Sequence, residues 1–324
     1  MSRLFNAIRN PRKFLCLLLI KFGRIIPDEA YLRLYHRVKT GKKLNLTNPK
    51  TYNDKCNWMK LHYKDPLYTQ LADKILSKKY VESVLGPGFT CPLIAVYSSV
   101  NEIDFSKLPN KFVIKTNHNS GCICICKDKE NGIIVQGKSD DQSLLSYDDV
   151  KNILNRSLAS NFYWNLREWP YKNIQKRILV EEYLEAPNGE NLKDYKFFCF
   201  HGEPKYVWMG TNYTPMYFDV YSTDWKNQHV AWGYENSPVD VPPPDGYQQM
   251  LEMARKLSAG IPHVRVDFFN VDGRIYVGEF TFYTWGGMEP IIPSDWENTL
   301  GDFIDIDKID CNCIIDKKIE SFEA

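Results

Sequence analysis

The chain has 324 residues, of which 44% are hydrophobic and 25% are charged, a balance that argues against wholesale disorder. Its formal net charge of +1 argues against a general polyanion binder, because such domains are usually strongly basic. At this length we expect two modest domains, or one larger domain with subdomains, around a well-buried core.

The first feature along the chain is a short apolar run at residues 14–20. The residues that flank it are basic: Arg12, Lys13, Lys21 and Arg24. The run is shorter than the roughly 20 residues that a membrane-spanning helix needs, and no signal-peptide cleavage site appears before Pro27. Two interpretations remain, a packed first helix or an interfacial helix at residues 12–26 that contacts anionic lipid. We expect a cytoplasmic protein, which the second interpretation makes peripheral at the inner face of the membrane.

Residues 1–100 have a mostly helical pattern. Apolar residues recur every three or four positions at residues 54–63 and 68–85, which predicts two helices. Asn53 is the expected cap of the first helix, and the glycine and proline residues at 86–88 end the second. A short extended run follows at residues 92–97.

From Lys111 onward the pattern changes to short β-rich runs separated by turns. The expected strands are residues 112–116, 122–126, 132–136, 177–182, 196–200 and 206–209. Helices are expected at residues 147–159 and 247–257, with a surface loop at 236–245. Two last strands, 264–270 and 274–281, are joined by an Asp-Gly turn, which is a strong hairpin signal. A helical region followed by mixed sheets indicates α+β architecture.

The nine cysteines are an odd number and are scattered. Cys122, Cys124 and Cys126 alternate along an apolar run, so we expect all three on one strand face. Neither this run nor the pair Cys311 and Cys313 has the two-residue gap that is typical of zinc sites. We favour buried or free thiols in a reducing cytoplasm over metal or redox use.

The last hairpin carries the sharpest chemical signal. Period-two alternation places Arg265 and Asp267 on one face of the first strand, and Glu279 and Thr281 share a face of the partner strand. Two carboxylates that face each other across a hairpin repel unless a cation relieves them. Mg²⁺ bridging nucleotide phosphates is one solution, with Arg265 holding an anionic oxygen. The alternative is a partly exposed hairpin with solvated charges.

Two further segments have candidate ligand-binding chemistry. A strand ends at Lys115 and is followed by a small polar turn, whose backbone N–H groups suit phosphate oxygens although it lacks Walker A spacing. His118 in this turn is either a general base or a surface residue. The apolar strand 178–182 ends in two acidic residues and suits adenine. A plain hairpin and a structural strand are the respective alternatives.

In this order, the segments resemble the ATP-grasp superfamily. The matching elements are Asp73-Lys74, Lys115 with residues 118–121, the acidic segment 181–184, Arg265-x-Asp267 and Glu279-x-Thr281. Thr281 stands at the position where the superfamily usually has an asparagine metal ligand. The chain further resembles the TupA-like ATP-grasp family, associated with bacterial surface-polysaccharide and teichuronopeptide gene clusters. That resemblance is carried by residues 46–55, 108–115, 167–173 and 194–202.

The resemblance implies an ATP-grasp fold of two α+β subdomains that clasp ATP, at residues 101–310, after a helical region 1–100 and before a tail 311–324. It implies Mg²⁺ at Asp267, Glu279 and Thr281, and catalytic roles for Arg265 and Lys115. The implied nucleotide contacts are Lys74, Lys115, the flap residues His118, Asn119, Ser120 and Gly121, the adenine and ribose segment Glu181, Glu182, Tyr183 and Leu184, and Lys196.

The implied function is a Mg-ATP-dependent carboxylate–amine ligase of surface-polysaccharide or capsule biosynthesis, acting on an amino acid and a uronic acid or glycan through an acyl-phosphate. A glycan kinase would use the same site. A glycosyltransferase would need an Asp-x-Asp motif, matched only by Asp305-Ile306-Asp307, and a non-catalytic scaffold would not need the charged set. We expect no nucleic-acid partner. Gly286 and Gly287 either border the acceptor, with Trp285 facing a sugar or amino acid, or simply turn the chain.

Overall fold

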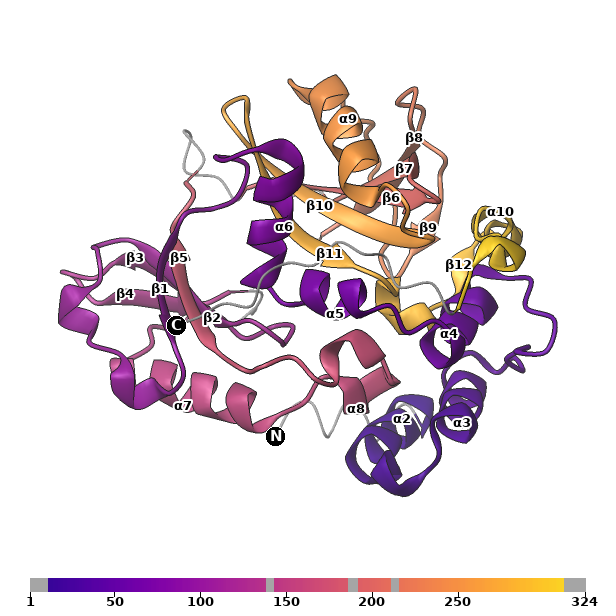
Figure 1. Ribbon diagram of the computed structural model, residues 1–324, viewed down its shortest axis with the longest axis horizontal. Helices are drawn as coiled ribbons and strands as arrows, with labels where there is room; N and C mark the ends of the chain where they lie inside the picture. Colours follow the sequence, from indigo (N-terminus) through magenta and orange to yellow (C-terminus); the bar gives the residue numbers. More distant parts are fainter. Residues whose placement is uncertain (1–10, 138–142, 186–191, 211–215, 312–324) are drawn as a thin grey trace.

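Two five-stranded antiparallel sheets form the frame of the molecule (Figure 1). The computed structural model describes residues 11–137, 143–185, 192–210 and 216–311. The first sheet has the order β1-β5-β2-β3-β4, and its strands are Leu93–Tyr97, Ile178–Glu182, Phe112–Thr116, Ile123–Asp128 and Ile133–Gln136. The second has the order β11-β10-β6-β7-β8, and its strands are Arg274–Thr281, His263–Val271, Asp194–Phe200, Glu203–Gly210 and Phe218–Ser222.

One face of the first sheet is covered by helix α7 (Tyr147–Ala159). Alternate residues of each strand reach this face, as the period-two rule requires. Phe112, Ile114 and Val180 are fully buried there with Val150 and Leu154 of the helix. The three alternating cysteines are confirmed as buried free thiols on one side of the sheet: Cys122, Cys124 and Cys126. The opposite face carries Lys115 and Glu181 and is not part of this apolar core.

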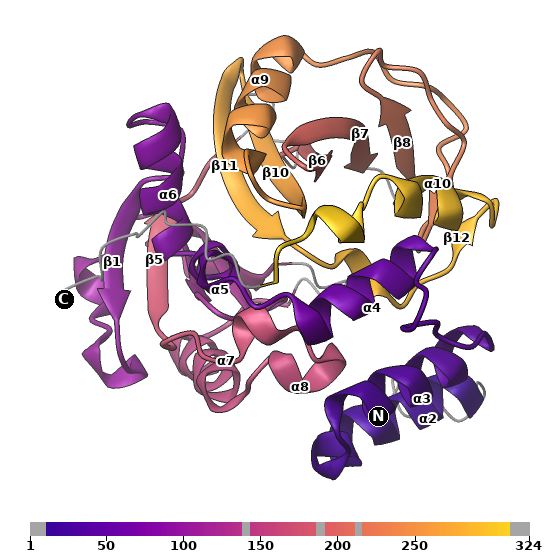
Figure 2. The same cartoon turned by 45° about the vertical axis from the view of Figure 1, so that its right-hand side comes forward.

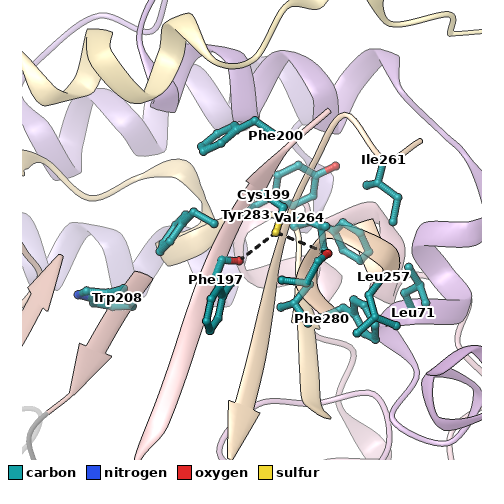
Figure 3. Packing of buried hydrophobic residues seen from close by; sticks show 14 of the residues in the cluster. Leu71, Phe197, Cys199, Phe200, Trp208, Leu257, Ile261, Val264, Phe280 and Tyr283 are labelled. Atoms are coloured by element: carbon teal, nitrogen blue, oxygen red, sulfur yellow. Dashed lines mark hydrogen bonds between the residues drawn. The ribbon is translucent and has the colours of Figure 1, made fainter. Parts of the chain in front are cut away.

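The second sheet packs against helix α9 (Tyr247–Ser258) through a larger core (Figure 3). Val264, Val266 and Phe268 are fully buried in it, which confirms the predicted alternation of the hairpin. The turn between β10 and β11 has positive φ at both Asp272 and Gly273, the conformation that Asp-Gly favours. The hairpin is therefore anchored on one face by burial, and its other face carries the charged residues.

The expected helix at 68–85 is wrong as a single element, because the chain breaks it in two. Helix α5 (Pro66–Ala72) ends before Asp73, and α6 (Leu76–Leu85) begins after Ile75. The Asp73 carboxylate accepts from the Ile75 backbone N–H at 2.8 Å, which stabilises the break. Both helices pack on the second sheet through β11. Tyr68 donates to the carbonyl of His263 at the start of β10, and Tyr80 donates to that of Leu257 in α9.

Helix α4 (Tyr52–His62) precedes this pair, and its predicted cap is also wrong. Thr51, not Asn53, caps the helix, and Thr51 forms a reciprocal capping box with Asp54. The expectation fails because Asn53 lies inside the first turn of the helix and serves another purpose, described below. Helix α10 (Trp296–Asp302) packs against α4, and β12 (Ile291–Ile292) pairs with β9 (Ala231–Trp232).

An N-terminal helical hairpin, α2 (Pro11–Phe22) and α3 (Asp28–Thr40), lies at one corner of the molecule (Figure 2). It is fastened by Arg167, which follows α8 (Tyr163–Leu166) and is 2% exposed. The Arg167 guanidinium pairs with Asp28 at 2.9 Å, donates to the Gly23 carbonyl at 2.7 Å and stacks 3.9 Å from the Tyr31 ring centre. Within the described ranges, every helix is too short or too polar to cross a bilayer.

Candidate functional site

The outer hairpin of the second sheet brings the predicted carboxylates together. Asp267 lies directly opposite Glu279, and Arg265 lies opposite Thr281. Arg265 binds Asp267 through two bonds of 2.6 Å, Nε to Oδ1 and Nη2 to Oδ2, and its Nη2 is 3.5 Å from Glu279 Oε1. A two-bond contact of this kind fixes the guanidinium plane as well as its charge.

The neighbouring strand β6 adds a lysine and a third carboxylate. Lys196 is the cross-strand partner of Asp267, and its Nζ is 3.0 Å from Asp267 Oδ2. The same ammonium contacts Asp194 Oδ2, two residues earlier on the strand. Asp194 Oδ1 is buried and has no hydrogen-bond partner. A carboxylate oxygen without a hydrogen-bond partner, close to other carboxylates, is a ligand atom that a bound cation would satisfy.

Burial and charge act against each other in this cluster. Burial would lower the pKa of Arg265, but Asp267 and Glu279 outweigh it, so the pKa is raised and the residue is always cationic. The pKa of Lys196 is raised in the same way, because Asp267 and Asp194 overcome its burial. Burial raises the pKa of Asp194, and Lys196 only partly offsets it. The cluster is thus held by two buried cations shared among carboxylates.

A second cluster lies on the open face of the first sheet. The Glu181 carboxylate of β5 binds two ammonium groups, Lys115 Nζ of β2 at 2.5 Å and Lys78 Nζ of α6 at 2.6 Å. Burial would raise the pKa of Glu181, but the two lysines hold it below its usual value. Both oxygens of Glu181 are therefore engaged by cations, whereas Glu182 is exposed and is followed by the half-buried Tyr183 and Leu184.

The turn after β2 is tied to the helix break described above. Asn117 is fully buried, and its side-chain amide donates to Asp73 Oδ2 at 2.9 Å. Lys74 donates from Nζ to the Asn119 carbonyl at 3.0 Å. Asp73 and Lys74 therefore hold the two ends of the turn, so that the helix pair and the turn form one unit.

The four predicted flap residues differ in exposure. His118 is 1% exposed and contacts the Ser157 carbonyl at 3.2 Å, and burial lowers the pKa of its imidazole to about 4. Asn119 is half-buried and bonds Ser157 and Ser160, whereas Ser120 and Gly121 are exposed. His118 is thus a neutral structural group that seats the turn on α7, and the exposed part of the turn is Ser120 and Gly121.

The two clusters are electrostatically coupled across the sheets. Burial would lower the pKa of Lys115, but Glu181 on its own sheet and Glu279 on the other both raise it. Helices α5 and α6 run between the sheets, packing on the second while Lys78 reaches Glu181 of the first (Figure 1).

A cavity of about 370 Å³ borders Ser120 and Gly121, but it lies on the α7 side of the first sheet. Its remaining walls include Ile153 and Ser157 of α7 and Cys122. Lys115 and Glu181 do not line it, because they project from the opposite face. The charged clusters, rather than this cavity, define the candidate site.

The carboxylates fit a hard divalent ion that is also bound by phosphate. No three-ligand metal cage of His, Cys, Asp or Glu is formed within the part of the chain that the structure describes. Mg²⁺ does not require one, since it is usually held by one or two carboxylates together with phosphate oxygens and water. Asp267 and Glu279 lie opposite each other, and the orphaned oxygen of Asp194 is beside them. Thr281 lies two pairs further along the ladder, opposite Arg265 rather than opposite a carboxylate.

Two residues of these clusters were missed by sequence reasoning. Lys78 lies in the helix after Asp73-Lys74, and nothing in the helical pattern marks it as facing Glu181. Asp194 lies two residues before Lys196, and the same period-two rule that paired Arg265 with Asp267 would have placed Asp194 and Lys196 on one face. The signal for Asp194 was present in the sequence, whereas the contact of Lys78 depends on tertiary packing.

The fold and this arrangement of charges define an ATP-grasp protein. A family model confirms the class, since TupA-like ATPgrasp matches residues 54–305. The chain belongs to the TupA-like ATP-grasp family, and the resemblance inferred from its motifs is confirmed. No curated protein matches the chain.

Solved structures of ATP-grasp enzymes are also similar at low identity. D-alanine–D-alanine ligase from Bacillus anthracis complexed with ATP is 15% identical, over 65% of this chain and 53% of that chain, with a TM-score of 0.36. D-alanine–D-alanine ligase from Helicobacter pylori is 13% identical, over 72% of this chain and 56% of that chain, with a TM-score of 0.40. L-amino acid ligase from Bacillus licheniformis is 12% identical, over 66% of this chain and 43% of that chain, with a TM-score of 0.39. The chain spans about half the length of these proteins, and at this TM-score the likeness carries no inference about residues.

Proposed function

We propose that the protein is a Mg-ATP-dependent ligase that activates a carboxylate as an acyl-phosphate and transfers it to an amine. The observation that carries the proposal is the cluster of Arg265, Asp267 and Glu279 on the second sheet, where Arg265 makes two bonds of 2.6 Å to Asp267 and lies 3.5 Å from Glu279, in a chain that the TupA-like ATPgrasp family model matches. Such an arrangement suits a reaction in which negative charge develops on a transferring phosphoryl group.

The residues divide into those that bind nucleotide and those that act on the acyl group. Lys115 and Lys74 would contact phosphates, with Ser120 and Gly121 closing over them. The segment from Glu181 to Leu184 would hold adenine and ribose through its backbone and through Glu182, because the Glu181 carboxylate already binds two lysines. Lys196 would reach a phosphate or the ribose.

Arg265 would stabilise the acyl-phosphate and the tetrahedral species that follows amine attack. It is preorganised for this task by its two bonds to Asp267 and by Thr284, whose hydroxyl is 3.4 Å from Nη1. Asp267 and Glu279, with Asp194 beside them, would hold Mg²⁺. When bound, the ion would supply charge neutralisation on the phosphates. Thr281 stays a proposed ligand of lower rank, because it faces Arg265.

A turnover screen tests this proposal directly. Purified protein with Mg-ATP is incubated with amino acids and uronic acids, singly and in pairs, and ³¹P spectra follow the products. We expect ADP and inorganic phosphate in equal amounts, only when a carboxylate and an amine are both present. A stable sugar phosphate would instead establish a glycan kinase. ATP that is bound and released without being turned over would support neither the ligase nor the kinase.

The broader setting is proposed on the family resemblance alone: surface-polysaccharide or capsule biosynthesis, with a uronic acid or glycan as one substrate. A domain division at residues 1–100, 101–310 and 311–324 is kept as a proposal, although the family match begins at residue 54. Residues 312–324 lie outside the described residues. The glycosyltransferase alternative gains no support, because Asp305 pairs with Lys308 near His201, beyond the end of β6.

We further propose that the N-terminal hairpin attaches the protein to an anionic membrane surface. Helix α2 and the turn after it expose six large apolar residues: Phe14, Leu15, Leu17, Leu18, Phe22 and Ile25. Ile25 is 93% exposed, which is unusual for a side chain of this type. Four basic residues and no acidic residue lie within 11–27. An apolar face with a basic rim matches the chemistry of anionic lipid headgroups over acyl chains.

Vesicle cosedimentation tests the attachment. We expect binding to phosphatidylglycerol vesicles and little to phosphatidylcholine vesicles, with weakening at high salt because the basic rim is screened. Leu17→Ser with Phe22→Ser should lower the affinity by about tenfold or more, because two large apolar side chains no longer leave water on binding. Ile292→Ser, which changes another exposed isoleucine, is the matched control. Equal binding of both variants, or self-association in place of vesicle binding, would contradict the proposal.

A further inference from the structure

A half-exposed tryptophan follows the charged strand β11 in a strained loop. Trp285 is 39% exposed, and Trp285, Gly286 and Gly287 all have left-handed backbones, with φ of 53°, 61° and 60°. Glycine tolerates this conformation, but a residue with a large side chain is strained in it. The fold therefore sustains a cost to display one indole at this position.

The loop is held from below by one face of helix α4. Three of its side chains donate to loop carbonyls: Lys60 Nζ to Gly286 at 2.6 Å, Asn57 Nδ2 to Gly287 at 2.8 Å and Asn53 Nδ2 to Glu289 at 3.0 Å. Lys60 is 1% exposed. Burying an ammonium group is unfavourable unless it is fully hydrogen-bonded. The buried polar groups on this helix face are therefore used to fix the loop. This role also explains why Asn53 is not a cap.

The indole ring is fixed as firmly as its backbone. Its Nε1–H donates to the Trp232 carbonyl at 3.3 Å. Gly233 lies against the ring, and a Cβ at that position would be 2.6 Å from Trp285 Cζ2. Only a residue without a side chain leaves room for the ring in this orientation.

Three more aromatic rings pack beside Trp285 and lead toward the charged cluster: Tyr234 is exposed, Phe218 is half-buried and Trp208 is buried. We name the set Trp208, Phe218, Tyr234 and Trp285 the aromatic platform. Tyr234 is 36% exposed and its ring centre is 5.7 Å from that of Trp285, while Trp208 lies beneath, 6.2 Å from Trp285. The guanidinium of Arg265 is 5.9 Å from the Trp208 ring. The platform is thus continuous with the site at which the proposed acyl group would react.

We propose that the aromatic platform binds a sugar ring of the substrate, which stacks on Trp285 while Tyr234, tilted by 43° from the indole, contacts its edge. The inference rests on the proposed function for the location of the reacting carboxylate at Arg265. A pyranose has a face of C–H groups that loses little on leaving water, and a rim of hydroxyls that stays hydrated. The half-exposed indole of Trp285, fixed by its bond to the Trp232 carbonyl, matches that face, whereas a linear amino-acid chain would need neither the flatness nor the rigidity.

Binding of pyranose oligosaccharides, measured by saturation-transfer NMR and tryptophan fluorescence, tests the platform. The probes are trigalacturonate and a neutral glucose trisaccharide, with L-glutamate and L-phenylalanine as ring-free and aromatic comparators. We expect a saccharide to bind with saturation on its ring protons. Trp285→Ala should weaken it by about tenfold or more, because the sugar face then stays in water, and Trp285→Phe should retain part of the affinity. Tyr147→Ala, which removes another half-exposed ring, on α7, should change nothing.

The loop's support is tested with Asn57→Leu, which removes the bonds of this amide to the Gly287 and Asn53 carbonyls and to Lys60 Nζ. The lysine's bonds to the Leu166 and Gly286 carbonyls stay in place. Saccharide affinity should fall while the thermal shift produced by Mg-ATP is kept. Three results would overturn the platform: saccharide binding that is unchanged in Trp285→Ala, no binding of both saccharides, or a preference for L-phenylalanine. A wild-type protein that binds saccharide but shows no response to Mg-ATP would instead overturn the proposed ligase function and leave the platform standing.

Discussion

Replacing Glu279 by glutamine is expected to lower ATP turnover by about 10²-fold or more while leaving the fold intact. The magnitude is that of removing one preorganised electrostatic interaction at a phosphoryl-transfer site. The Glu279 side chain is 40% exposed and its contact with Arg265 is long, at 3.5 Å, so its removal should cost little stability. Turnover at saturating Mg²⁺ and the melting temperature without ligand are the two measurements.

Asp267→Asn should reduce turnover similarly but should also lower the melting temperature. Asp267 neutralises both Arg265 and Lys196, and breaking a buried pair typically costs about 3–5 kcal/mol. Glu203→Gln, on the same sheet and paired with Arg255 at the surface, is the control for a glutamate without a proposed role. Near-normal turnover in both carboxylate variants would sink the ATP-grasp mechanism. Thr281→Asn, which restores the superfamily's usual residue, should retain or tighten the Mg²⁺ dependence.

Lys115→Ala is expected to remove most of the thermal stabilisation that Mg-ATP gives. The stabilisation that a ligand gives the native state grows with the logarithm of its affinity, and a charge-assisted bond to phosphate contributes about 1.5–3 kcal/mol. The affinity should therefore fall by about 10–100-fold. Glu181 keeps Lys78 as a partner, so the protein without ligand should lose only a little stability.

Lys111→Ala is the matched control for Lys115→Ala. Lys111 precedes the same strand, but it is exposed and pairs with Glu185 at 2.6 Å. It should keep the full Mg-ATP shift. A full shift in Lys115→Ala would mean that the phosphates lie elsewhere, and an abolished shift in Lys111→Ala would mean that general positive charge, not position, drives binding.

The sequence was most informative where local periodicity and tertiary burial agree. The hairpin of β10 and β11 has an Asp-Gly turn and an alternating first strand, so its existence and the buried face of β10 followed from spacing. The turn alone would pair Asp267 with Gly278, and a bulge between Asp267 and Phe268 shifts the register so that Asp267 lies opposite Glu279. Helix α7 likewise begins and ends where its pattern predicts. These elements are specified by signals within a few residues of one another.

The expectations from sequence were wrong where a contact with a residue far away in the chain determines the structure. Apolar spacing continues through residues 73–75, but Asn117 and the Ile75 N–H both bond Asp73 and break the helix there. Two facing carboxylates alone would repel, so that removing either should be neutral or stabilising. Arg265 and Lys196 reverse that expectation for Asp267, and Lys196 comes from a strand some seventy positions earlier. Side chains brought together by strand order cannot be paired from spacing alone.

The carboxylate of Glu181 acts as an internal counterion for two lysines. In the proposed function, an arriving phosphate would compete with it for Lys115, so binding would be an exchange of anions and not the capture of an anion by bare charge. The exchange lowers the net gain per contact, but the ammonium groups are already ordered and lose little further freedom. Selectivity follows: a monoanion that only replaces Glu181 gains nothing, whereas a polyphosphate also reaches the cations of the other sheet. If the proposed function holds, a carboxylate held between two lysines would therefore bias this site toward ligands of high charge.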